Sequence, residues 1–101
     1  MTKVSMFGKF SPAEGKSEEM DAALAVVVAA IEPWDGTEAY SYHRAEDGTY
    51  RFYALFTDMD AMQRHGQTEG MQAAMPAFMA ALAGPPEMAI TTPIAAAGSD
   101  A

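Results

Sequence analysis

Residues 37–57 read TEAYSYHRAEDGTYRFYALFT and carry the strongest strand signal in the chain. Its two halves are rich in aromatic residues of high strand propensity: Tyr40, Tyr42, Tyr50, Phe52, Tyr53 and Phe56. The linker AEDG between the halves contains the pair Asp47-Gly48, which is typical of the tip of a hairpin. The stretch therefore predicts two antiparallel strands, Thr37–Arg44 and Tyr50–Thr57, joined by a tight turn.

The N-terminal third predicts a strand followed by a helix. Lys3–Phe10 alternates with a period of two, which is the pattern of a strand. From Ser17 onward the apolar residues recur at steps of three and four, so they share one face of a helix. This stripe consists of Met20, Leu24, Val27, Val28 and Ile31. We expect Ser17 to cap the helix at its N-terminus and Pro33 to help end it.

The C-terminal half predicts two more helices and one more strand. Residues 58–66 favour a short helix, and Thr68 is expected to cap a longer one. Pro76 lacks the backbone N–H that a helix interior needs, so we expect a kink or a break there. Met88–Ile94 predicts the last strand, and residues 96–101 are expected to be a frayed tail.

The element order βαββαβ is that of ferredoxin-like folds. Residues 1–95 are therefore expected to form a single α+β domain, with a four-stranded antiparallel sheet and its helices on one face. The third strand is apolar on both sides, because Tyr53 and Leu55 point away from Phe52 and Phe56. A sheet of this kind needs a second cover, and the chain has no helix left to provide it. We therefore expect a homodimer in which two sheets pack face to face.

Composition excludes several classes of function. The chain has 101 residues, 6 Lys+Arg against 14 Asp+Glu and a formal net charge of −8, which argues against nucleic acids and anionic membranes as partners. There is no cysteine, so disulfides and thiolate catalysis are excluded. The two histidines, His43 and His65, have no metal-ligand spacing, and no metal is expected. No run of residues has the length and apolarity of a membrane helix, and the expected location is the cytoplasm.

Short motifs run from strand two to the last helix. Gly36 precedes strand two, which has Tyr40 near its centre and Arg44 at its end. Strand three starts with the Arg-aromatic pair Arg51-Phe52. Ala61 lies four residues before His65, and Thr68 lies three residues after it. In these motifs the chain resembles the antibiotic-biosynthesis-monooxygenase-like family of the dimeric α+β barrel superfamily. The resemblance implies a cofactor-independent monooxygenase that acts on a phenolic or quinol-like small molecule in an apolar pocket.

His65 is the expected catalytic base, because a neutral imidazole can accept a proton near neutral pH. The alternative for His65 is a structural role, in which it closes the helix end by bonding to backbone carbonyls. Methionine is flexible and polarisable, so a helical methionine stripe suits either a pocket wall or the core. The expected substrate-binding residues are Tyr40, Arg51, Tyr53, Met71, Met75 and Met79.

The chain also departs from the family's pattern. Many members have Glu-x-Trp near the end of strand three, where this chain has Ala54 and Phe56. A non-catalytic dimer that binds an apolar ligand is therefore the first alternative, and haem binding through His65 is the second. Trp34, in the loop after the first helix, is expected to contact the partner subunit, the pocket rim or the end of that helix.

Overall fold

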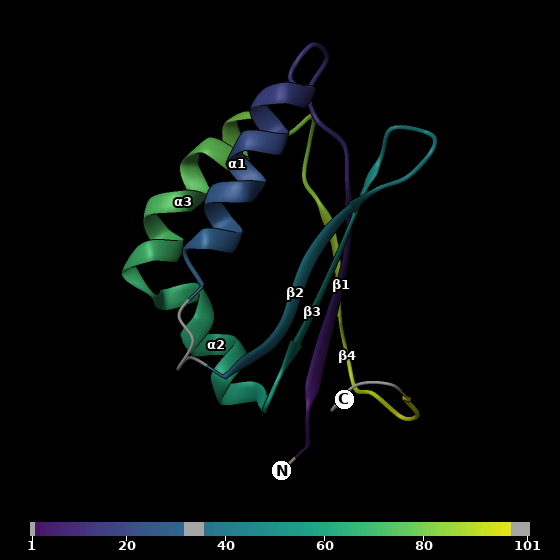
Figure 1. Ribbon diagram of the computed structural model, residues 1–101, viewed down its shortest axis with the longest axis vertical. Coiled ribbons are helices and arrows are strands. Elements are labelled where there is room, and N and C mark those ends of the chain that lie inside the picture. The colour runs from purple at the N-terminus through teal and green to yellow at the C-terminus, as the bar shows by residue number, and fades with distance from the viewer. Residues whose placement is uncertain (1, 32–35, 98–101) are drawn as a thin grey trace.

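The computed structural model describes residues 2–31 and 36–97, which form one four-stranded sheet and three helices. In chain order these are β1 (Val4–Phe10), α1 (Ser17–Ala29), β2 (Thr37–Arg44), β3 (Tyr50–Phe56), α2 (Met59–Gln67), α3 (Glu69–Ala80) and β4 (Glu87–Thr91). The strands lie in the order β2-β3-β1-β4, and all neighbours are antiparallel. Helices α1 and α3 lie side by side over one face of the sheet, and α2 lies near one end of it (Figure 1). The predicted ferredoxin-like α+β fold is confirmed.

The side chains of β3 divide between the two faces of the sheet, as alternation requires. Those that join the core beneath the helices are Tyr50, Phe52, Ala54 and Phe56, each at most 5% exposed. Arg51, Tyr53 and Leu55 point to the opposite face, which no helix of the described residues covers (Figure 1). Leu55 is nevertheless buried, and Tyr53 packs against Phe7 of β1 with ring centroids 5.2 Å apart. The outer face of the sheet therefore carries an apolar patch, as the sequence predicts.

Helix α1 buries most of its predicted stripe. Met20 and Val27 are fully buried, but Val28 is 43% exposed, because it lies about 100° around the helix from Val27. The expected cap at Ser17 is wrong. Ser17 is the first helical residue, Lys16 precedes it, and no side chain caps this end. Helix α1 packs against α3 and contributes Met20, Leu24 and Val27 to the core.

Helices α2 and α3 are both capped by side chains. The Asp58 carboxylate accepts a hydrogen bond from the Ala61 N–H (2.8 Å), and the Thr68 hydroxyl accepts one from the Met71 N–H (3.2 Å). The prediction for Thr68 is confirmed. Helix α3 continues through Pro76, so of the two expected outcomes, a kink or a break, the break does not occur. Because Pro76 lies on the exposed side of α3, water can satisfy the carbonyl that its ring leaves unbonded.

The C-terminal strand is shorter than predicted. It ends at Thr91, and residues 92–97 have no regular structure. Trp34, Pro33 and the end of the expected tail lie outside the described residues.

Candidate functional site

A cavity of about 140 Å³ lies between the helix-facing side of the sheet and helices α2 and α3. Its wall consists of Met6, Phe10, Tyr40, Tyr42, Phe52, Phe56, His65, Met75, Phe78, Pro86 and Met88. The inner wall is aromatic and consists of Phe52, Phe56 and Phe78, which are nearly inaccessible to solvent. The rim lies toward β4, where Met88 is 51% exposed. Among these lining residues none is an acid, a lysine or an arginine, so the cavity favours an uncharged ligand.

His65 enters the cavity from the last turn of α2. Its side chain is buried and lies between two aromatic rings, with centroids 5.0 Å from Tyr40 and 5.3 Å from Phe56. The ring nitrogen Nδ1 lies 3.5 Å from the Thr37 hydroxyl at the start of β2, at the outer limit of a hydrogen bond. An imidazole in this position can accept a proton from a ligand or polarise one of its oxygens.

Tyr40 and Tyr42 lie two residues apart on β2 and therefore face the cavity together. Their hydroxyls are 3.1 Å apart and share a hydrogen bond. Burial raises the pKa of both phenols, and for Tyr42 the neighbouring Tyr40 raises it further. Both hydroxyls therefore keep their protons at neutral pH and act as hydrogen-bond donors.

These three residues form a row along one wall of the cavity. The Tyr40 ring lies in the middle, 5.0 Å from the His65 ring and 5.6 Å from the Tyr42 ring. They carry the only polar side chains among the residues that line the cavity. The wall thus combines one group that can accept a proton with one hydrogen-bonded pair of phenols.

The structure brings together three of the residues that the sequence singles out and separates the other four. His65, Tyr40 and Met75 line the cavity. Arg51 and Tyr53 lie on the opposite face of the sheet, because they alternate with Phe52. Arg51 there donates to the Thr49 hydroxyl.

The methionine stripe of α3 also divides. Met71 is 2% exposed in the core, Met75 is half-buried at the cavity, and Met79 is 57% exposed. Residues four apart on an α-helix advance by about 40° around its axis, so a strict four-residue repeat turns away from the core after two steps. The buried face of α3 follows steps of three and four instead, through Met71, Ala74 and Phe78.

Some lining residues were not among the candidates. Tyr42 could have been found by its two-residue spacing from Tyr40, since both must face the same side of a strand. Met6 could have been assigned to the helix side from the alternation of β1 once Phe10 was assigned to the core. Pro86 and Met88 reach the cavity only because β4 pairs with β1 in the observed register, for which the sequence holds no local signal.

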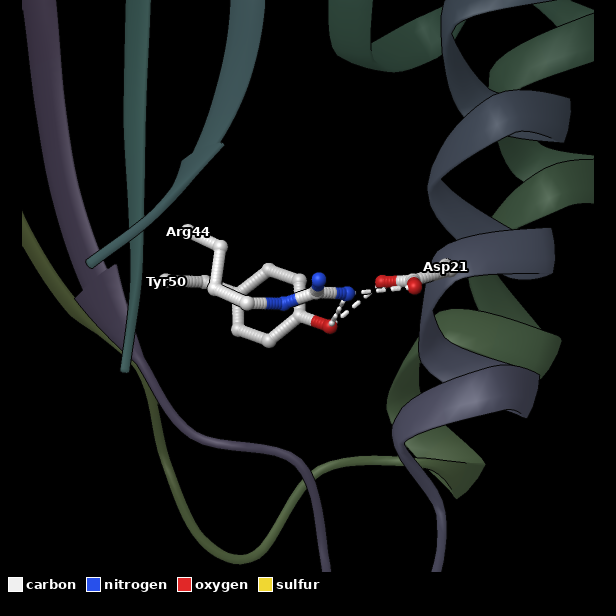
Figure 2. Close-up of polar contacts among 3 residues, drawn as sticks. All are labelled: Asp21, Arg44 and Tyr50. Carbon is white, nitrogen blue, oxygen red and sulfur yellow. Dashed lines mark hydrogen bonds and ion pairs between the residues drawn. The ribbon is translucent and has the colours of Figure 1, made fainter. Parts of the chain in front are cut away.

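A second polar cluster lies outside the cavity, between α1 and the β2–β3 hairpin. There Asp21 accepts hydrogen bonds from Arg44 and from the Tyr50 hydroxyl, and Arg44 also donates to Tyr50 at 3.0 Å (Figure 2). The bond from Tyr50, followed by that from Arg44, lowers the pKa of the Asp21 carboxyl. The three groups satisfy one another, and the cluster serves to tie α1 to the hairpin.

Two further properties bear on partners and cofactors. Within residues 2–31 and 36–97 there is no group of three or more His, Asp or Glu side chains placed to hold a metal ion. No helix in the same part of the chain is long and apolar enough to cross a membrane.

Comparison with known proteins agrees with the fold. Rv0793 from Mycobacterium tuberculosis superimposes with a TM-score of 0.86 at 16% identity, over 96% of this chain and all of the other (100%). A variant of SnoaB, a cofactor-independent oxygenase from Streptomyces nogalater, superimposes with a TM-score of 0.82 at 20% identity, over 96% of this chain and 98% of the other. The NE2512 protein of Nitrosomonas europaea, of unknown function, gives 0.81 at 22% identity, over 100% and 98% of the two chains.

At these identities the structural likeness establishes the fold alone. Comparison with curated proteins gives no match. The sequence itself matches one family profile, described as antibiotic biosynthesis monooxygenase, over residues 4–77. This match covers most of the chain and eight of the eleven residues that line the cavity. The protein therefore belongs to the antibiotic biosynthesis monooxygenase family.

Proposed function

We propose that this protein is a cofactor-independent monooxygenase that oxidises a phenolic or quinol-like small molecule in the 140 Å³ cavity. The observation that carries the proposal is the row His65–Tyr40–Tyr42 on an otherwise apolar wall. Family membership and the fold shared with SnoaB, a cofactor-independent oxygenase, support the same reaction class.

The reaction needs only a base, oriented hydrogen bonds and dioxygen. His65 accepts a phenolic proton, and the electron-rich anion that results passes one electron to dioxygen. The two radicals combine to form a C–O bond at the ring, and the resulting peroxide anion takes the proton back from His65. The hydroperoxide then loses water to give a carbonyl. For a hydroquinone the balance is one quinol and one O₂ giving one hydroxyquinone and one H₂O. The apolar wall favours this first electron transfer, because a desolvated phenolate is a stronger reductant than a hydrated one.

The experiment measures oxygen uptake with a panel of hydroquinones for the wild type, His65→Ala and His65→Gln. General-base catalysis contributes about 10²- to 10⁴-fold, so both variants should lose at least ~100-fold in kcat. His43→Gln is the matched control, because His43 is exposed at the end of β2 and should keep the wild-type rate. A His65→Ala variant that consumes oxygen as fast as the wild type across the panel would remove the proposed base.

A second candidate is a non-catalytic dimer that binds the same ligands. It is favoured by Ala54 and Phe56, which stand where many family members have a glutamate and a tryptophan. Among the described residues that line the cavity, none carries a carboxylate. Under this reading the same assay gives no enzyme-dependent oxygen uptake with any quinol, while calorimetry still detects ligand binding.

Haem is not favoured as a ligand. A cavity of about 140 Å³ is close in size to the ~150 Å³ apolar cavity that accommodates one benzene ring in another protein. A haem macrocycle joins four pyrrole rings, and its bulk exceeds this space. A titration with haemin in which His65→Ala abolishes a Soret shift would reverse this conclusion.

We also propose that the protein works as a homodimer through the outer face of the sheet. Phe7 is 49% exposed there and contacts Tyr53, with Leu55 beside them on β3. A second copy of the same sheet is the economical cover for this patch, since it matches the patch in shape and polarity.

A further inference from the structure

The Tyr40–Tyr42 pair has a hydrogen-bonding capacity that the base mechanism does not use. Of the two hydroxyl protons, one is spent on the bond between the phenols, which are 3.1 Å apart. The other proton remains available as a single donor. Because burial raises the pKa of both groups, this donor persists across the neutral and mildly alkaline range. A pair of this kind matches one acceptor oxygen on a ligand.

The Tyr42 side chain lies between two spaces and lines both of them. On one side is the 140 Å³ cavity, and on the other is a groove of about 300 Å³ beside α1. The groove is lined by Asp21, Leu24, Tyr42, His43, Arg44 and Tyr50. The Tyr42 ring is held between them by Phe52, with centroids 5.0 Å apart, and by the edge of Phe10 at 6.0 Å. This ring therefore ends the cavity on the α1 side.

We propose that the Tyr40–Tyr42 phenol pair binds the oxygen of a ligand that has a single aromatic ring, and that the Tyr42 ring sets this size limit. The inference rests on the proposed function only in taking this cavity as the ligand site. The volume of the cavity matches one ring. The polar row places the proton acceptor, His65, beside Tyr40, which is also the nearer member of the phenol pair. A single-ring phenol can therefore bond to the pair while its ring packs on Phe52 and Phe56.

The test measures equilibrium binding by calorimetry under argon, so that turnover does not enter. The probes are 4-methylphenol, toluene, which keeps the ring and methyl group without the oxygen, and anthrone, which has three fused rings. The wild type should bind 4-methylphenol more tightly than toluene. It should bind anthrone no more tightly than 4-methylphenol, although anthrone has the larger apolar surface, because the extra rings stay outside the cavity.

Two variants separate the two parts of the proposal. Tyr40→Phe/Tyr42→Phe keeps both rings and removes both hydroxyls. It should weaken binding of 4-methylphenol by roughly three- to tenfold, the value of one net hydrogen bond, and leave toluene unchanged. Tyr42→Ala opens the cavity into the groove and should tighten anthrone binding by at least about tenfold. Tyr53→Phe, which removes a phenol from the outer face, is the matched control and should change neither.

The proposal is overturned if the double phenylalanine variant binds 4-methylphenol as the wild type does, or if the wild type binds anthrone more than about tenfold tighter than 4-methylphenol. It is also overturned if no probe binds. If circular dichroism shows that Tyr42→Ala does not fold, the three outcomes above still test the proposal, because none of them depends on this variant. Oxygen uptake is measured separately. The expected binding pattern without any oxygen uptake would therefore remove the monooxygenase and keep the recognition site.

Discussion

Replacing Gly36 with alanine should be among the most damaging single-methyl changes in this protein. Gly36 precedes β2 and has φ +86°, a left-handed conformation that side chains disfavour. A Cβ atom at Gly36 would lie 2.6 Å from the Ala61 Cβ and 2.9 Å from the Thr57 hydroxyl. The Gly36 carbonyl also accepts a hydrogen bond from the Thr57 N–H at 3.0 Å, which limits how far the backbone can move away.

The expected loss has two parts. The left-handed conformation costs a residue with a Cβ about 1–2 kcal/mol. The overlap with Ala61 adds about 1–3 kcal/mol, the usual cost of overpacking, because Ala61 is fully buried and its Cβ has no rotamer to change. Together they predict a loss of roughly 2–5 kcal/mol in the free energy of unfolding, a large share of the ~5–15 kcal/mol of a typical domain.

The assay is urea denaturation at one fixed protein concentration, with Gly48→Ala as the matched control. Gly48 has φ +87° at the hairpin tip, and a Cβ there would meet nothing within 4 Å. Its loss should therefore contain the backbone part alone. The Ala61→Gly change in the Gly36→Ala background should recover most of the steric part, which a double-mutant cycle isolates.

If Gly36→Ala and Gly48→Ala lose the same free energy of unfolding, the overlap with Ala61 has no measurable cost. Helix α2 then moves away from the added methyl group without loss of stability. A Gly48→Ala variant as stable as the wild type would instead refute the backbone part. In that case the left-handed conformation costs nothing measurable at either glycine.

Two further predictions concern charge and assembly. The folded-state pKa of Asp21 is lowered, so its bonds to Tyr50 and Arg44 stabilise the fold above the unfolded-state pKa near 4 and are lost as pH falls through the folded-state value. Stability measured from pH 6 to pH 2 should therefore fall more steeply for the wild type than for Asp21→Asn, and parallel curves would contradict this. For the homodimer, sedimentation equilibrium at micromolar concentration should give a dimer for the wild type and a monomer for Phe7→Glu, because a carboxylate buried in an apolar interface is costly. Val26→Glu, on the exposed side of α1, should remain a dimer, and a monomeric wild type would remove the proposal.

The sheet could be predicted from the sequence because its signals are local. The alternation of β1 and the hairpin at Asp47-Gly48 each specify a structure within a few residues. The same alternation assigns Tyr40 and Tyr42 to one face of β2, so two of the three polar residues of the cavity follow from the sequence. It also assigns Arg51 and Tyr53 to the other face, away from Phe52. Arg51 belongs to the family's motifs and Tyr53 has a hydroxyl suited to binding, but the alternation of β3 keeps both away from the cavity.

The helices were predicted less well because their contacts depend on rotation. A repeat of four residues fits one helical face over a short distance only, so Met71 and Met75 reach the interior while Met79 does not. The continuity of α3 through Pro76 likewise depends on which side of the helix meets water. Local propensity does not predict which side of the helix is exposed, because that depends on the element against which the helix packs.

His65 joins the cavity through a chain of contacts that begins at Gly36. The absence of a side chain at Gly36 lets Ala61 approach β2 closely, and Ala61 lies one turn before His65 on α2. Close docking of that turn brings the imidazole to the Thr37 hydroxyl and to the Tyr40 ring. Gly36, Ala61 and His65 are also three of the positions by which the chain resembles its family. On this reasoning the glycine and the alanine act as positioning residues for the base. Gly36→Ala should therefore reduce oxygen uptake even under conditions where the variant is fully folded.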